Sequence, residues 1–222
     1  MKNLTKIIST LLCAVLLLSN VASASENKDY ADTLYDLGLF KGTDNGYELE
    51  KTLTREESAT ILVRLLGAEA DLDAGDYEEV FTDVSKDRWS FAYVMYCYDN
   101  DITKGTGNNT FSPEAEVTAE EFVTLVLRLM GYTYIEPDSS LEESIYLNLL
   151  NSEVVRDFET AHEFTRDDMV YVVYRSLMTK TAEGEVLANE LANLGVLTDE
   201  QAEEFDVYEI EDINEMIDRI LG

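Results

Sequence analysis

Two long segments of the sequence repeat one another, and this repetition constrains the fold more than any other feature. Gly42 and Gly105 are 63 positions apart, and Thr54 and Thr118 are 64 positions apart. Self-similarity at such a period predicts copies of one supersecondary unit that bury their apolar faces against one another. The most complete copy extends over residues 80–131.

Each copy ends in a segment with the signals of an α-helix. Thr54 and Thr118 are each followed three positions later by a glutamate, which is the pattern of a capping box. Apolar residues then recur at helical spacing until Gly67 or Gly131, where a helix commonly ends in a left-handed residue. Thr165 begins the corresponding helix of a third, degenerate copy, which has an aspartate in the glutamate's place and no closing glycine.

The third copy also differs upstream of that helix start. Its first helix is expected at residues 144–150, after a short acidic linker at residues 133–140, and Asn151–Ser152 replaces the glycine turn. Beyond residue 180 the pattern changes, and Thr198 with Gln201 predicts another capped helix. The chain is therefore expected to be mainly α, with residues 181–222 as a helical C-terminal extension.

The N-terminal segment has the features of a secretory signal peptide. Lys2 and Lys6 precede the apolar residues 7–18, and Ala22-Ser23-Ala24 supplies small residues for cleavage after Ala24. A retained membrane anchor is the less favoured alternative, because this run is shorter than the roughly 20 residues that span a bilayer. We therefore expect residues 1–24 to be removed, and an exported protein without a membrane span.

The charge and the scarcity of reactive side chains exclude several functions. The net charge is −30, which repels nucleic acid and anionic membranes at long range. His162 is the only histidine, and Cys97 lies in an apolar helical run, as a buried core thiol does. No catalytic constellation, metal site or cofactor is expected, and the chain is not expected to be an enzyme.

At this point the residues resemble a known family, the S-layer homology (SLH) repeats. The resemblance rests on Phe81-Thr82-Asp83-Val84, Trp89, Ile102, Gly105, Thr110-Phe111-Ser112-Pro113 and the Thr-Arg-Glu-Glu helix start at residues 54–57. It assigns residues 25–68 and 78–132 to repeats one and two and residues 133–180 to a degenerate third repeat.

The resemblance implies a fold and a ligand. Three such repeats form one pseudo-threefold helical domain, which holds proteins of this family non-covalently on the bacterial cell wall or in its S-layer. The ligand is an anionic secondary cell-wall polysaccharide, a peptidoglycan-linked polymer that often bears pyruvate ketals, bound in grooves between repeats. A main ligand contact of the family, the arginine of its Thr-Arg-Ala-Glu motif, matches Arg55 and Arg166, whereas Ala119 stands at this position in repeat two.

The chemistry of the two arginines agrees with that implication. Each is expected at the first position of a helix, where free backbone N–H groups attract anions, and a guanidinium can bind a carboxylate through two hydrogen bonds. The alternative is that Arg55 and Arg166 are solvated and pair with acidic neighbours such as Glu56 and Asp167.

Five further residues are candidates for the polysaccharide site. Trp89 would stack on a sugar ring or fill the core between repeats. Lys41 and Lys104 would contact an anionic polymer, and Gly42 and Gly105 would supply turns of positive φ that let a ligand approach the backbone. The alternative function is a structural protein of a surface assembly, in which the degenerate repeats bind a surface-protein partner.

Overall fold

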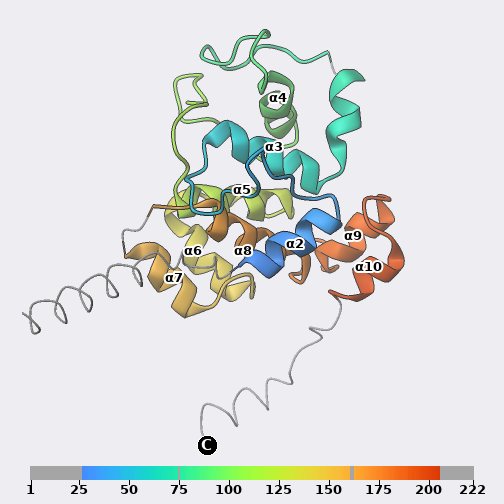
Figure 1. Cartoon of the computed structure of the whole chain (residues 1–222). Coiled ribbons are helices and arrows are strands. Elements are labelled where there is room, and N and C mark those ends of the chain that lie inside the picture. The colour runs from blue at the N-terminus through green and yellow to red at the C-terminus, as the bar shows by residue number, and fades with distance from the viewer. Residues whose placement is uncertain (1–26, 75, 161–162, 206–222) are drawn as a thin grey trace, which may run out of the picture.

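The computed structural model describes residues 27–74, 76–160 and 163–205, and these residues form a mainly helical protein (Figure 1). The helices are α2 (Lys28–Asp36), α3 (Arg55–Leu65), the 3₁₀ helix η2 (Ala68–Ala74), α4 (Phe91–Asp99), α5 (Ala119–Leu129), α6 (Pro137–Tyr146), α7 (Ser152–Glu159), α8 (Arg166–Leu177), α9 (Leu187–Asn193) and α10 (Asp199–Glu203). Within those ranges only isolated β-bridges occur, and no sheet forms. The mainly α prediction is confirmed, while the predicted signal peptide and the end of the extension, residues 206–222, lie outside the described residues.

Four helices, α3, α5, α8 and α10, begin at the predicted capping boxes. In α3 the Thr54 hydroxyl accepts from the Glu57 N–H, and the Glu57 carboxylate accepts from the Thr54 N–H. The same reciprocal pair fixes the starts of α5 at Thr118 and of α8 at Thr165, where an aspartate replaces the glutamate. Each threonine cap contributes about 1 kcal/mol to stability.

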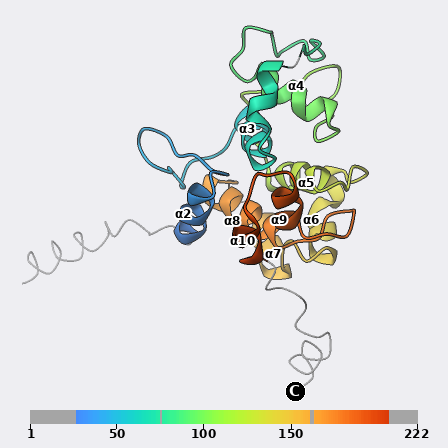
Figure 2. The same ribbon diagram turned by 90° about the vertical axis from the view of Figure 1, so that its right-hand side faces the viewer.

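The helices pack in pairs that link one copy of the unit to the next. Helix α4 packs against α3, and α6 packs against α5, so the first helix of a copy lies on the last helix of the preceding copy. Helix α2 packs against α8, which brings the beginning of the described chain to the third copy. Figures 1 and 2 show α3 and α4 at one end of the molecule, with the other two pairs beside them.

Loops of neighbouring copies satisfy the backbone donors at two of these helix starts. The first two N–H groups of α3 donate to the carbonyl groups of Ala115 and Pro113 at 2.9 and 3.1 Å. The first two N–H groups of α8 donate to Lys51 and Leu49 at 2.8 and 2.9 Å. A helix start leaves such donors unpaired within the helix. These bonds pair them, and they align each helix start with the loop of the neighbouring copy in the same way at both junctions.

The third copy departs from the prediction upstream of α8. Its first helix, α6, begins at Pro137, inside the segment expected to be a linker, and ends at Tyr146 rather than residue 150. Proline suits the first turn of a helix, where its missing N–H costs nothing. After α6, Asn148 takes the positive φ that Gly38 and Asp101 take after α2 and α4. Helix α7 then replaces the glycine turn of the other copies.

The extension described up to residue 205 docks against the ends of α3 and α5. Gly67 has a φ of 65°, and a Cβ there would lie 2.5 Å from the Val196 side chain. Gly131 has a φ of 91°, a Cβ there would lie 3.0 Å from the Ala182 side chain, and the Ala182 N–H donates to Met130. The two helix-ending glycines therefore also make room for the extension.

The core includes the one cysteine outside the predicted signal peptide. Cys97 is buried, its thiol donates to the Ala59 carbonyl at 3.7 Å, and burial raises its pKa to about 12. A thiol with such a pKa is inert at neutral pH, so the predicted core role is confirmed. Within the described residues, every helix is too short or too polar to cross a bilayer.

Candidate functional site

A cleft of about 170 Å³ gathers predicted site residues from segments far apart in the sequence. Its lining consists of Phe40, Lys41, Gly42, Thr43, Glu57, Thr60, Ile61, Arg64, Trp89 and Arg166. Helix α3 forms one wall, the loop after α2 forms another, and the start of α8 contributes the arginine. Four of the seven predicted residues, Lys41, Gly42, Trp89 and Arg166, therefore share one site, which we call the Arg166 cleft.

Arg166 is held in this cleft by two acceptors. Its Nη2 lies 3.0 Å from the Glu57 carboxylate, and its Nη1 donates to the Tyr47 carbonyl at 3.4 Å. Its side chain is 12 % exposed. The expected alternative partner, Asp167, bonds instead to the Asn27 amide at 2.9 Å. The guanidinium is thus oriented by the fold and reaches the cleft surface.

A second cationic group stands beside Arg166. The Glu69 carboxylate lies 2.7 Å from the Lys41 ammonium and 2.8 Å from Arg64 Nε, and it accepts from the Tyr93 hydroxyl. Burial raises the pKa of Glu69, but the hydrogen bonds from Lys41 and Arg64 outweigh burial and bring it down to about 2. Two cations therefore share one carboxylate.

Trp89 provides an aromatic surface at the edge of the cleft. The side chain is 58 % exposed, so the alternative that it fills the core between repeats is wrong. Its ring lies beside α4, with the Tyr93 ring centroid 6.4 Å away. An exposed, partly fixed indole can stack on the apolar face of a sugar ring.

The two predicted glycines are needed for different reasons. Gly105 has the expected positive φ of 75°, and a Cβ there would lie 2.4 Å from the Thr110 carbonyl oxygen. Gly42 does not adopt a positive φ, so that expectation is wrong. A Cβ at Gly42 would instead lie 2.8 Å from the Gly46 carbonyl oxygen, so close backbone packing requires glycine there.

Arg55 occupies the matching place between repeats one and two, yet its side chain is 6 % exposed. Its Nε donates to the Phe111 carbonyl at 2.8 Å, its Nη1 pairs with Glu121 at 2.8 Å, and it lies 5.1 Å from the Phe111 ring centroid. The expected partner Glu56 binds Arg88 instead. We call this junction the Arg55 groove; its arginine is enclosed by protein groups.

The Arg55 groove also differs at its mouth. Lys104 and Arg128 both pair with Glu136, whose side chain makes no capping bond to α6. Glu136 directly precedes the first position of α6, close to where Trp89 stands before α4. Lys104 and Gly105 therefore lie away from the Arg166 cleft, beside a carboxylate rather than an indole.

Three charged residues in or beside the Arg166 cleft were missed from the sequence as site members: Glu57 and Arg64 line the cleft, and Glu69 contacts its Lys41 and Arg64. Glu57 was recognised only as a capping residue, although the spacing that places it in the cap also places it against Arg166. Arg64 occurs in an apolar helical run that gave no functional signal. Glu69 lies in residues 69–79, an acidic segment that the sequence favours as a linker between the first two copies, and no motif distinguishes it there from its neighbours.

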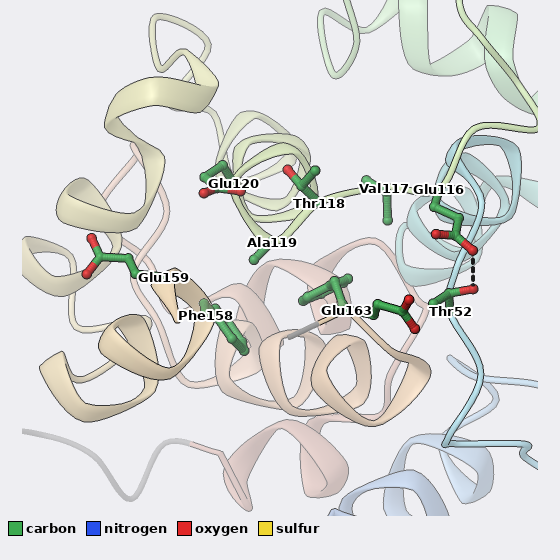
Figure 3. Close-up of a pocket in the computed structure, with 10 residues that line it drawn as sticks. Thr52, Glu116, Val117, Thr118, Ala119, Glu120, Phe158, Glu159 and Glu163 are labelled. Atoms are coloured by element: carbon green, nitrogen blue, oxygen red, sulfur yellow. Dashed lines mark hydrogen bonds between the residues drawn. The ribbon is translucent and has the colours of Figure 1, made fainter. Parts of the chain in front are cut away.

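The third matching helix start has no arginine, and a larger pocket of about 440 Å³ lies there (Figure 3). Ala119 occupies the position of Arg55 and Arg166, and it faces Phe158 across the pocket. Glu116, on the pocket wall, accepts a hydrogen bond from the Thr52 hydroxyl at 2.8 Å.

Comparisons with known proteins agree with this architecture. Residues 80–123 match the S-layer homology domain. The chain is 34 % identical over 121 residues to the middle cell wall protein of Brevibacillus brevis, a match that covers 52 % of this chain and 12 % of that protein. It is 33 % identical over 118 residues to the surface layer protein of Brevibacillus choshinensis, with 51 % and 11 % covered.

A third relative matches over most of the chain. The cell surface protein of Thermoanaerobacter kivui is 25 % identical over 215 residues, which are 86 % of this chain and 27 % of that protein. The chain therefore spans only a small part of the length of these relatives. The chain thus contains an S-layer homology domain at residues 80–123 and is related to surface-layer and cell-wall proteins.

Proposed function

We propose that this protein attaches non-covalently to the bacterial cell surface by binding an anionic secondary cell-wall polysaccharide in the Arg166 cleft. The observation that carries the proposal is the convergence of Arg166, Lys41, Gly42 and Trp89 on one cleft. Polymers with pyruvate ketals fit well, because a ketal carboxylate can bind a guanidinium through two hydrogen bonds. The names of the relatives, which are surface-layer and cell-wall proteins, support the location.

The fold supports this function as a rigid frame. We infer that residues 25–68, 78–132 and 133–180 are three related units around a pseudo-threefold axis. The three capping boxes and the three inter-copy helix pairs support this arrangement. In such a frame, the Arg166 cleft is lined by residues of all three units, so a ligand contacts positions that the fold has already oriented.

Local charge explains how such an acidic chain would bind an anion. The net charge of −30 repels an anionic polymer at long range, while the cleft concentrates Arg166, Arg64 and Lys41 within a small volume. The ion pairs that hold Lys41 and Arg64 are partly exposed and therefore weak. A carboxylate ligand can replace part of them at low cost. The absence of a catalytic constellation in the sequence supports a binding role over an enzymatic one.

Sedimentation with purified cell-wall sacculi tests the proposal. Wild-type protein should sediment with the walls, and Arg166→Ala should sediment at least about tenfold less well, because a charged bidentate contact is lost. Arg156→Ala is the matched control, since Arg156 is an exposed arginine of α7 outside the cleft.

Walls stripped of secondary polymer separate the two candidate functions. The proposal predicts that wild-type protein fails to sediment with stripped walls. Sedimentation that persists on stripped walls, or that is equal for wild type and Arg166→Ala, would contradict polysaccharide binding in this cleft and favour attachment through a protein partner.

A further inference from the structure

The third helix start differs from the other two by one side chain. Arg55 and Arg166 occupy the first positions of α3 and α8, and Ala119 occupies the first position of α5. Each of the two arginines pairs with a carboxylate at its junction, and the 440 Å³ pocket lies at the junction that lacks an arginine. The pocket is separate from the Arg166 cleft, with which it shares no lining residue.

The aromatic partner of the arginine is nevertheless retained at this junction. Phe111 stands seven positions before the capping threonine of α5, and its ring and carbonyl group hold the Arg55 guanidinium. Tyr47 stands seven positions before the threonine of α3, and its carbonyl group holds Arg166. Phe158 stands seven positions before the threonine of α8, and it lines the pocket opposite Ala119. Two junctions of the same molecule therefore show that this kind of junction accepts a guanidinium group.

The pocket is also suited to a cation with an apolar stem. Its floor is formed by four buried side chains, Val117, Ala119, Phe158 and Phe164. Four glutamates complete the lining with two threonines, and none of the ten described lining residues is a lysine or an arginine; the glutamates are Glu116, Glu120, Glu159 and Glu163. Figure 3 shows Glu163 and Glu116 on one side of Phe158 and Glu159 on the other.

We propose that this pocket receives an arginine side chain from a basic segment of a protein partner. The guanidinium would lie over the Phe158 ring, as that of Arg55 lies over Phe111, with the rim carboxylates around it. A planar guanidinium stacks on an aromatic ring and gives up its water more readily than an ammonium, so arginine is preferred to lysine. The net charge of −30 draws a basic segment toward the protein.

Isothermal titration of the full chain with two short peptides tests this site. One peptide carries two arginines between alanines, and the other carries two lysines at the same positions. We expect saturable binding of the arginine peptide with one site per chain, and binding of the lysine peptide about tenfold weaker. Equal affinity for the two peptides, or no saturable binding of the arginine peptide, would overturn the proposal.

Two substitutions locate the binding. Ala119→Arg would fill the pocket with the chain's own guanidinium, so it should weaken binding of the arginine peptide at least about tenfold and raise the thermal unfolding midpoint. Glu163→Gln leaves the pocket open and should weaken binding roughly threefold. Glu142→Gln, on the exposed face of α6, is the matched charge control and should change nothing. If Ala119→Arg and Glu163→Gln both bind the peptide as wild type does, the peptide contacts only the diffuse acidic surface, and the proposed site is wrong.

Discussion

The Arg166 cleft and the Arg55 groove are built from equivalent residues, but Arg166 borders an open cleft and Arg55 is enclosed. In each, an arginine at the first position of a helix donates to a carbonyl group and pairs with the capping glutamate of the adjoining repeat. Around Arg55 the Phe111 ring and Glu121 close the space, whereas Arg166 borders a cleft with an exposed indole. One helix-start motif therefore produces either a structural arginine or a candidate ligand contact.

The residues at the mouth decide between the two outcomes. Glu136 lies against Lys104 and Arg128, so it satisfies the cations of the Arg55 groove from within the chain. In the Arg166 cleft, Glu69 plays this part for Lys41 and Arg64, and Trp89 remains available beside it. A binding role can therefore be assigned to the helix-start arginine of an SLH-type repeat only when the residues around it are known.

The largest expected difference between the two arginines is in stability. Arg55→Ala should lower the free energy of unfolding by about 3 kcal/mol, because it leaves the buried Phe111 carbonyl and the Glu121 carboxylate without their donor. Arg166→Ala should cost less, about 1 kcal/mol, because the bond from Arg166 to the Tyr47 carbonyl is longer, at 3.4 Å against 2.8 Å for Arg55 and Phe111, and the Arg166 side chain is more exposed. Urea denaturation of both variants measures the difference, and equal losses would contradict the structural assignment of Arg55.

Substitution of the exposed tryptophan should affect binding more than folding. Trp89→Ala should weaken wall binding about fivefold, through loss of stacking worth about 1 kcal/mol. Its free energy of unfolding should change by less than about 0.5 kcal/mol, since the side chain is 58 % exposed.

Tyr146→Ala is the control for this substitution, because Tyr146 is 71 % exposed on α6 and lies outside the cleft. It should bind walls as wild type does. If Trp89→Ala bound equally well, stacking on the indole would be excluded.

The smallest expected effect is on the pH dependence of stability. The pKa of Glu69 is lowered from 4.5 to about 2 in the folded protein, so its stabilisation is present above pH 4.5 and is lost as the pH falls toward 2. In the Glu69→Gln variant, the free energy of unfolding should therefore fall less between pH 4.5 and pH 2 than it does in wild type. The Lys104 hydrogen bond also lowers the pKa of Glu136. Because Glu136 is 53 % exposed, Glu136→Gln should reduce this loss of stability less than Glu69→Gln does.

Urea midpoints at pH 7 and at pH 3 measure this effect. Glu79→Gln, an exposed acidic position, controls for the change in net charge. A Glu69→Gln variant that loses as much stability as wild type between these pH values would contradict the role of the Lys41–Glu69–Arg64 group.

Local signals explain which parts of the structure were predictable. The Thr-x-x-acid patterns located the starts of α3, α5 and α8, because capping depends on residues three positions apart. The apolar run around Cys97 located a buried helix face. The association of Arg166 and Trp89 with Lys41 and Gly42 agrees with the resemblance that selected them.

The remaining features depend on contacts between distant residues. Nothing near Arg55 in the sequence shows that Phe111 and Glu121 enclose it, and nothing in the acidic linker distinguishes Glu69. The exposure of Trp89 depends on how α4 lies on α3. The early start of α6 was missed because an acidic segment was taken for a linker, although its proline suits a first helical turn.

The most direct test uses Trp89 as a probe, because it is the only tryptophan in the chain and lies in the cleft. Titration with purified secondary wall polysaccharide should produce a saturable change in tryptophan fluorescence in wild type and in Arg156→Ala. In Arg166→Ala the apparent affinity should fall about tenfold or more. An unchanged titration curve for Arg166→Ala, or no fluorescence change in wild type, would contradict ligand binding in the Arg166 cleft.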